Sequence, residues 1–166
     1  MGAAQRLAEL GLELPAVAAP VAAYVPAVRT GSYVYTSGQL PFVAGALPVT
    51  GKVGTGAGLV DPETATAQAR VAALNALAAV ADLVAREGGP AGADALDRVA
   101  RVVKVVGFVA SDPSFTGQPG VVNGASLLLG DLLGDAGVHA RSAVGVAALP
   151  LDAPVEVELV VELLAD

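Results

Sequence analysis

Near its C-terminus the chain reads ARSAVGVAALPLDAPVEVELVVELL, residues 140–164, and this stretch is the most informative about the fold class. From residue 155 onward it alternates between two faces, with Val155, Val157, Leu159 and Val161 on one and Glu156, Glu158, Val160 and Glu162 on the other. Successive side chains of a strand point to opposite sides, so 155–164 predicts a strand with one buried face and one face open to water or a partner. Residues 140–149 predict a second strand, which we expect to pair with the last one across the PLDAP connection.

Two helices and a further strand precede this pair. Asp61-Pro62-Glu63 predicts a helix start, because Asp caps helices, Pro suits the first helical position, and Glu complements the positive end of the dipole. Apolar residues at helical spacing continue to the Gly88-Gly89-Pro90 stop. The Val-rich run 98–110 predicts a central strand, and the three- and four-residue spacing over 121–133 predicts a second helix.

The N-terminal part is the least regular. Residues 3–14 predict a short amphipathic helix, prolines at 15, 20 and 26 keep the next segment extended, and 32–37 predicts a strand. Residues 39–56 are expected to be loop and a short strand.

The order β-β-α-β-α-β-β predicts one α+β domain over 20–166, after a leader at 1–19, with two helices on one face of a mixed sheet. The uncovered sheet face predicts a homo-oligomer.

Composition excludes several kinds of chemistry. The 166 residues contain no Cys and 1 His, which removes thiol nucleophiles and metal sites built from Cys or several His within one subunit. The net charge of −7 and 4% aromatic content make nucleic-acid binding unlikely on electrostatic grounds. Although mean hydropathy is +0.65, no uncharged stretch suits a membrane span and the start does not fit a signal peptide, so we predict a cytoplasmic protein.

Two charged residues stand out in otherwise apolar strands. Arg141 begins the strand at 140–149, and Glu156 begins the last strand. An arginine at a strand end can bind a carboxylate through two parallel hydrogen bonds, and a nearby carboxylate can accept a proton or orient a water. A structural ion pair between the two, or simple exposure to solvent, is the alternative interpretation.

The segment HARSAVGVAALPLDAPVEV, residues 139–157, resembles the C-terminal signature of the Rid/YjgF family of reactive enamine/imine deaminases, formerly called L-PSP endoribonucleases. The block PVAAYVPAVRTGSYVYTSGQLP, residues 20–41, resembles the family's N-terminal motif, with Tyr24 at its early tyrosine and Ser37-Gly38-Gln39 as its SGQ. Asn123 falls at the asparagine of the family's second helix. The resemblance runs from about residue 20 to 162 and fits a longer subgroup.

This resemblance implies a chorismate-mutase-like fold assembled as a homotrimer, with clefts between subunits and neither metal nor organic cofactor. It implies that Arg141 clamps the carboxylate of a 2-aminoacrylate-type imino acid, that Glu156 positions water or transfers a proton, and that hydrolysis yields a 2-keto acid and ammonia. The remaining substrate-binding positions that it implies are Tyr24, Ser37, Gly38, Asn123 and the backbone at Ala143.

Three positions depart from the family pattern. Ala143 stands where many members have Cys, Ser126 where short members have Tyr, and His139 where a small residue is common. His139 shares strand parity with Arg141, so it either faces the cleft or is a hydrogen-bonded structural residue. The departures leave open a second function, a trimer that binds small carboxylates without turnover. The family's older name suggests a third, an endoribonuclease, against which the acidic charge argues.

Overall fold

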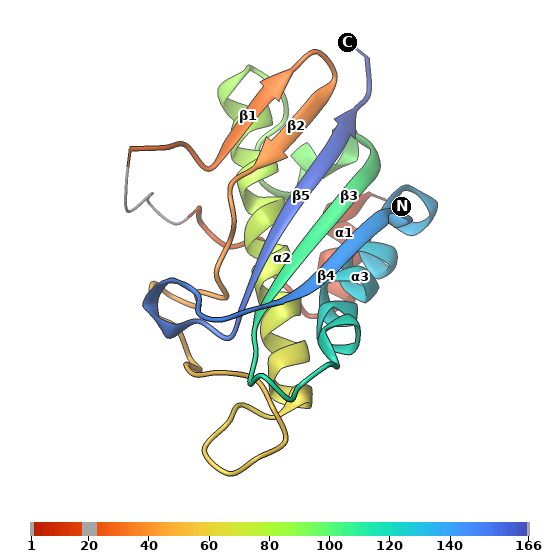
Figure 1. Ribbon diagram of the computed structural model, residues 1–166. Coiled ribbons are helices and arrows are strands. Elements are labelled where there is room, and N and C mark those ends of the chain that lie inside the picture. The colour runs from red at the N-terminus through yellow and green to blue at the C-terminus, as the bar shows by residue number, and fades with distance from the viewer. Residues whose placement is uncertain (1, 18–22, 166) are drawn as a thin grey trace.

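The computed structural model of the protein describes residues 2–17 and 23–165, which form three α-helices, five strands and short 3-10 turns (Figure 1). The helices are α1 (Ala3–Glu9), α2 (Pro62–Arg86) and α3 (Gln118–Leu133), and the strands are β1 (Ala27–Thr30), β2 (Tyr33–Thr36), β3 (Val99–Ala110), β4 (Ala140–Val146) and β5 (Val155–Leu163). The 3-10 turns are η1 (Gly92–Arg98), η2 (Gly134–Gly137) and η3 (Pro150–Asp152). The α+β class and the single mixed sheet are therefore confirmed.

The strands lie in the order β1-β2-β5-β3-β4. β3 runs parallel to β4, and the other neighbouring pairs are antiparallel. The predicted pairing of the last two strands is wrong, because β3 lies between β4 and β5. The η3 connection carries the chain past β3, with Leu151 and Asp152 both in the left-handed region at φ 57 and 58. Among the described residues, β4 is consequently an edge strand that pairs with β3 alone.

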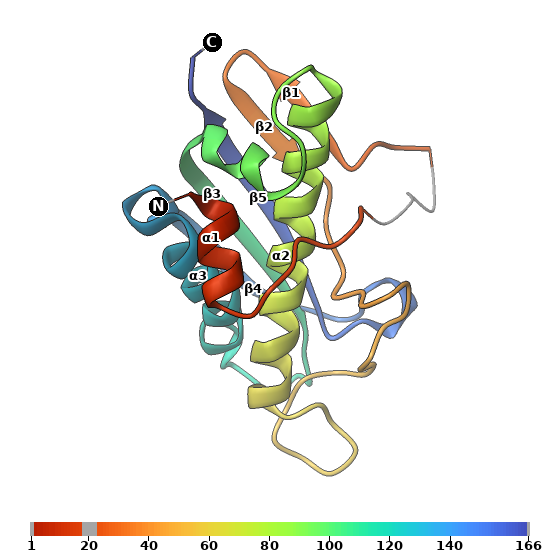
Figure 2. The same cartoon turned by 180° about the vertical axis from the view of Figure 1, so that it is seen from behind.

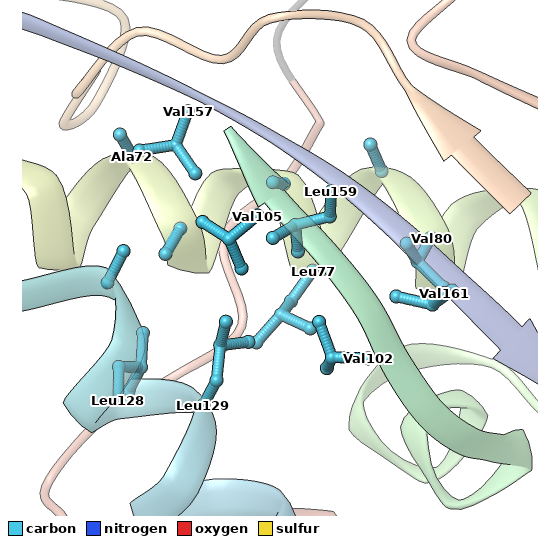
Figure 3. Close-up of a cluster of buried hydrophobic side chains, with 14 of the residues drawn as sticks. Ala72, Leu77, Val80, Val102, Val105, Leu128, Leu129, Val157, Leu159 and Val161 are labelled. Atoms are coloured by element: carbon cyan, nitrogen blue, oxygen red, sulfur yellow. The ribbon is translucent and has the colours of Figure 1, made fainter. Parts of the chain in front are cut away.

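Both long helices cover one face of the sheet, and the core lies between them and the strands (Figures 1 and 2). α2 begins as predicted, with the Asp61 carboxylate accepting a 2.9 Å hydrogen bond from the Thr64 amide. Figure 3 shows how α2, α3, β3 and β5 interdigitate in this core, through Leu77 and Val80, Leu128 and Leu129, Val102 and Val105, and Leu159 and Val161. Such burial of aliphatic side chains is the main stabilising contribution to the fold.

The opposite face of the sheet carries none of the helices formed by the described residues (Figure 1). The predicted alternation of β5 is confirmed, since its Val and Leu side chains from 155 to 163 are buried except Val160, and its Glu side chains are half-buried on the open face. The open face also presents Val144 at 44% exposure and Tyr35 at 44%. An apolar sheet face of this kind is typical of a surface that another chain covers.

The N-terminal strands differ from their expected positions. The first two strands form a tight hairpin over 27–36, so one strand was missed and the strand expected within 39–56 is replaced by isolated bridges. β1 is only four residues long and directly follows Pro26, which hid it from the pattern. α1 ends at Glu9, earlier than predicted, and its Ala3 and Leu7 join the common core. α3 begins three residues earlier than expected, at Gln118.

Within the described residues, α2 is the one helix long and apolar enough to span a membrane, and 72% of its apolar window is buried inside the protein. Its hydrophobicity is thus accounted for by contact with the sheet and with α3. The predicted boundary between leader and domain, at residues 19 and 20, lies outside the described residues.

Candidate functional site

Arg141 is held by α3 through three hydrogen bonds. One guanidinium nitrogen, Nη1, donates to Asn123 Oδ1 at 2.8 Å and to Ser126 Oγ at 3.1 Å. The other, Nη2, donates to the Pro119 carbonyl oxygen at 3.1 Å. Arg141 is paired in register with the buried Val105 of β3, so its side chain leaves the sheet on the helix-covered face, where α3 lies beside β4. The guanidinium is therefore oriented by the protein before any ligand arrives.

Ser126 also contacts His139, which lies immediately before β4. Ser126 Oγ and His139 Nε2 are 2.9 Å apart, and His139 Nδ1 lies 2.6 Å from the Gly137 carbonyl oxygen. A carbonyl oxygen only accepts, so Nδ1 carries a proton and the neutral imidazole accepts the serine proton at Nε2. His139 is thus hydrogen-bonded at both ring nitrogens, with Ser126 between it and Arg141.

A second group of predicted residues gathers where β2 ends and β5 begins. The Ser37 hydroxyl donates to the Val25 carbonyl at 2.6 Å, which ties the segment carrying Tyr24 to the end of the hairpin. Gln39 forms two backbone hydrogen bonds with Val157, of 2.9 and 3.0 Å. These bonds place Gly38 directly against Glu156, so that a Cβ at Gly38 would lie 1.7 Å from Glu156 Oε1. Only glycine leaves space for the carboxylate here.

The environment of Glu156 favours its protonated form. Partial burial raises the pKa of the Glu156 carboxyl above its ordinary value of 4.5, and the like charge of Glu158 on the same face raises it further. Desolvation disfavours the charged state because the carboxylate loses hydration that the neighbouring apolar strands do not replace. A carboxylate with a raised pKa accepts a proton more readily than one on the surface.

The structure defines the positions of two further predicted site residues, Tyr24 and Ala143, less closely. Tyr24 is 44% exposed and precedes the hairpin, on the Ser37–Glu156 side of the molecule. Ala143 lies two residues beyond Arg141 on the same face of β4 and packs against the core, in register with Gly107. Because β4 is an edge strand, one side of its backbone near Ala143 has no partner strand within the part of the chain that the structure describes.

The structure separates the predicted site residues into two clusters. The arginine cluster contains Asn123, Ser126, His139 and Arg141, and the glutamate cluster contains Ser37, Gly38 and Glu156. Glu156 is in register across β3 with Phe108 and Val144 on the open face, whereas Arg141 lies on the helix-covered face. Strand spacing puts the Arg141 and Glu156 Cα atoms about 14 Å apart. The alternative of an ion pair between them within one chain is wrong.

One hollow on the surface, of about 760 Å³, lies away from both clusters. It is lined by α1, the segment that follows it and α2, mainly through apolar residues such as Leu7, Leu12 and Ala81. It contains none of the predicted site residues.

Sequence reasoning missed two groups that hold Arg141. The Pro119 carbonyl gives no signal in a sequence, because it is main chain. The Ser126 contact did leave a signal in the sequence, since Asn123 and Ser126 are three residues apart and share a helix face. Sequence reasoning treated Ser126 only as a departure from the family pattern and did not connect it with His139.

These features define a small α+β protein that orients an arginine on an edge strand and keeps a half-buried carboxylate on the open sheet face. A family model described as "YjgF/chorismate mutase-like, putative endoribonuclease" matches residues 4–163. The chain belongs to this YjgF family, and the resemblance noted from the motifs is confirmed. The match begins within α1, so the N-terminal helix is part of the family unit.

Individual relatives agree with this assignment. The chain is similar to protein TCP17 of Trypanosoma cruzi, at 45% identity over 96% of this chain and 93% of the relative. It is similar to the crystal structure of Atu1372 from Agrobacterium tumefaciens, a protein of unknown function, with 42% identity, coverage of 98% and 94%, and a TM-score of 0.82. A structure described as a putative endoribonuclease from Shewanella oneidensis matches at 32% identity, with coverage of 98% and 100% and a TM-score of 0.86.

Proposed function

We propose that the protein hydrolyses small 2-imino acids, of the 2-aminoacrylate type, to 2-keto acids and ammonia. The observation that carries the proposal is the pre-oriented Arg141, whose guanidinium is held at three points by α3. An imine carbon is already electrophilic, so the protein needs to supply orientation and a placed water rather than a cofactor.

The arginine would bind the substrate carboxylate. A guanidinium has five N–H donors, and the bonds to Asn123, Ser126 and Pro119 use three of them. The donors left over are Nε–H and one Nη2–H, which can bind the two oxygens of a carboxylate side-on. Ala143, two residues along the same face of the edge strand, would offer backbone groups to the substrate, and Asn123 Nδ2 lies beside the clamp.

Glu156 would activate the water. As water adds to the carbon of the protonated imine, one water proton passes to the Glu156 carboxylate, and a neutral carbinolamine forms. Glu156 then returns that proton to the amine nitrogen. The C–N bond breaks with its electron pair going to nitrogen, the hydroxyl proton passes to the Glu156 carboxylate as the 2-keto acid forms, and Glu156 gives this proton to the departing ammonia. The raised pKa of Glu156 suits both steps, since the group must first accept and then donate a proton. Gly38 keeps the carboxylate in place, and Ser37 and Tyr24 border it.

A complete site would need two copies of the chain, since one chain holds Arg141 and Glu156 on opposite faces of its sheet. We propose a homotrimer in which the arginine cluster of one subunit meets the glutamate cluster of the next. The exposed apolar side chains on the open sheet face, Tyr35 and Val144 among them, favour such burial. In Escherichia coli TdcF, a protein of similar fold with 24% identity, coverage of 89% and 92%, and a TM-score of 0.57, serine is bound.

The primary test is ammonia release from 2-iminobutanoate generated in situ by a threonine dehydratase. We expect Arg141→Ala to lower kcat/KM by about 100-fold or more, because both the clamp and its charge are lost. Arg86→Ala is the matched control, since its surface pair with Asp82 contributes little to stability. Equal rates for the wild type and Arg141→Ala would refute the proposed function.

Subunit mixing tests the shared site. Arg141→Ala and Glu156→Gln subunits, each inactive alone, are refolded together in equal amounts. A cleft is intact when Arg141 comes from one variant and Glu156 from the other, which occurs with a chance of one half times one half. We therefore expect about a quarter of the wild-type activity to return in mixed trimers. No recovery in assembled mixed trimers would contradict a site built from two copies.

The second candidate is a carboxylate-binding trimer without turnover, favoured by Ala143 at the position where many members have Cys. Binding of 2-oxobutanoate that is lost in Arg141→Ala, with imine hydrolysis at background, would support it over the enzyme.

Ribonuclease activity is disfavoured by the net charge of −7, which repels phosphates. RNA cleavage that co-purifies with the trimer and disappears in Arg141→Ala would reverse this view. A cytoplasmic location is part of the proposal.

A further inference from the structure

We infer that Ser126 and His139 are positioning residues that set the orientation of the Arg141 guanidinium and thereby choose which of its N–H groups reach a ligand. The inference rests on the proposed function for its consequence, which is the side-on binding of a substrate carboxylate. Its structural part concerns Arg141 alone and is testable without substrate.

The carbonyl oxygen of Gly137 lies 2.6 Å from His139 Nδ1. That oxygen can only accept, so Nδ1 must carry a proton, and in the neutral ring Nε2 is an acceptor. Gly137 is itself held tightly, because a Cβ there would lie 2.2 Å from the Leu129 carbonyl oxygen. The ring position is consequently fixed from the turn that joins α3 to β4.

Ser126 transmits this constraint. Its hydroxyl has one proton, which it donates to His139 Nε2 across 2.9 Å. With that proton committed, the oxygen faces Arg141 with lone pairs only, and it accepts from Nη1 at 3.1 Å. A free serine hydroxyl would rotate among several partners, whereas this one has a fixed direction.

The consequence is selective use of the donors on Arg141. Ser126 and Asn123 together occupy Nη1, and both partners come from successive turns of α3. Pro119 accepts from Nη2 on the same side. Without Ser126, one Nη1–H is released and the guanidinium can turn within its plane, so the free donors no longer present one carboxylate-binding edge. His139 acts on Arg141 only through Ser126, which predicts that the two residues are not additive.

The test combines a measurement without ligand and one with ligand. The first is the order of the Arg141 side chain, read from its Nε–H resonance in ¹⁵N relaxation and assigned by its loss in Arg141→Lys. We expect Ser126→Ala and His139→Ala each to lower that order parameter, and Ser126→Thr, which keeps the hydroxyl, to restore it. Ser32→Ala, a serine remote from the clamp in the β1–β2 turn, is the matched control and should change nothing.

The second measurement is KM and kcat for imine hydrolysis, or the Kd for 2-oxobutanoate. We expect Ser126→Ala to raise KM or Kd by about tenfold, the effect of losing one hydrogen bond to a charged group. The double variant Ser126→Ala/His139→Ala should be no worse than Ser126→Ala alone. Additive losses would overturn the relay through Ser126 and leave His139 acting on its own.

The two measurements separate the failure of the inference from failure of the proposed function. An unchanged Arg141 order parameter in folded Ser126→Ala and His139→Ala overturns the inference, whatever the kinetics show. A lowered order parameter in a protein that neither hydrolyses imines nor binds 2-oxobutanoate supports the positioning role and refutes the proposed function. If Ser126→Ala is unstable, His139→Ala tests the same chain of bonds without altering α3.

Discussion

Replacing Gly38 by Ala separates the position of the Glu156 carboxylate from the stability of the fold. A Cβ at Gly38 would lie 1.7 Å from Glu156 Oε1, 2.6 Å from its Cδ and 3.0 Å from its Cγ. An ordinary carbon–oxygen contact is about 3.5 Å, so the carboxylate must withdraw by more than about 1 Å. The atoms in the way belong to the end of a flexible side chain, which can rotate aside.

The effect on stability should be small. The backbone at Gly38 does not have a positive φ, so alanine is compatible with it. Half-burial of Glu156 allows its carboxylate to move toward water, and we expect a loss of about 1 kcal/mol or less in the free energy of unfolding. That corresponds to a fall of about 2–4 °C in Tm for a chain of this size.

The effect on activity should be large, because a displacement of about 1 Å at a catalytic group can lower the rate about 100-fold. We expect Gly38→Ala to lower kcat for 2-iminobutanoate hydrolysis by about 100-fold. KM should be nearly unchanged, because Arg141, which would bind the substrate carboxylate, belongs to the arginine cluster and not to the glutamate cluster. The assay is ammonia release under coupled threonine dehydratase turnover, and thermal melting is measured on the same samples. Gly130→Ala, on an open face of α3 with no atom within 4 Å of its added Cβ, is the control.

Two results would refute this reasoning. A folded Gly38→Ala variant with kcat within about threefold of wild type would mean that the position of Glu156 does not limit the reaction. A Tm lowered by more than about 10 °C would mean that Gly38 is needed for folding, and the contact with Glu156 would no longer be the explanation.

Two further predictions concern stability. Burial raises the pKa of Glu158 above its ordinary value, so its stabilising contribution is present at acid pH and is lost as pH rises through the folded-state pKa. Glu158→Gln should therefore raise Tm by about 1–2 °C at pH 7, with the gain vanishing toward pH 4, and a gain that grows on acidification would contradict this. Gly124→Ala should cost about 3 kcal/mol in chemical denaturation, because its Cβ would lie 2.0 Å from the Thr66 carbonyl oxygen of α2. Gly130→Ala on the same helix should instead be neutral or stabilising, and equal losses in both variants would argue against the close helix contact.

The parts of the fold that were predicted well are those with local causes. The start of α2 follows from Asp61-Pro62-Glu63, and its end from the glycine pair near residue 88, since capping and chain breaking act within a few residues. The alternation of β5 likewise depends only on which side chains can be buried. The β1–β2 hairpin was missed because its strands are four residues each, too short for a periodic pattern to emerge.

The pairing of the last strands shows why non-local features were not predicted. A five-residue connection between two strands normally joins an antiparallel pair, and PLDAP offers no local sign that it does otherwise. β4 instead pairs parallel with β3 over seven positions, from Lys104–Ala140 to Ala110–Val146. Which strand occupies the space beside β5 is decided by the total burial of the Val-rich β3, a property of the whole core.

The order of the strands, which is a non-local feature, also determines how the residues of the candidate site are arranged. Arg141 and Glu156 were identified from their types, since isolated charges in apolar strands require a partner or a role. Their spatial relation was not available from the sequence, because inserting β3 between β4 and β5 puts each residue on its own face. The residues that contact them in space, Ser126 for Arg141 and Gly38 for Glu156, then complete two separate clusters. This chain orients an arginine on one face of its sheet and desolvates a glutamate on the other face. The two side chains can meet only across a contact with another copy of the chain, so subunit mixing is the sharpest test of the proposed function.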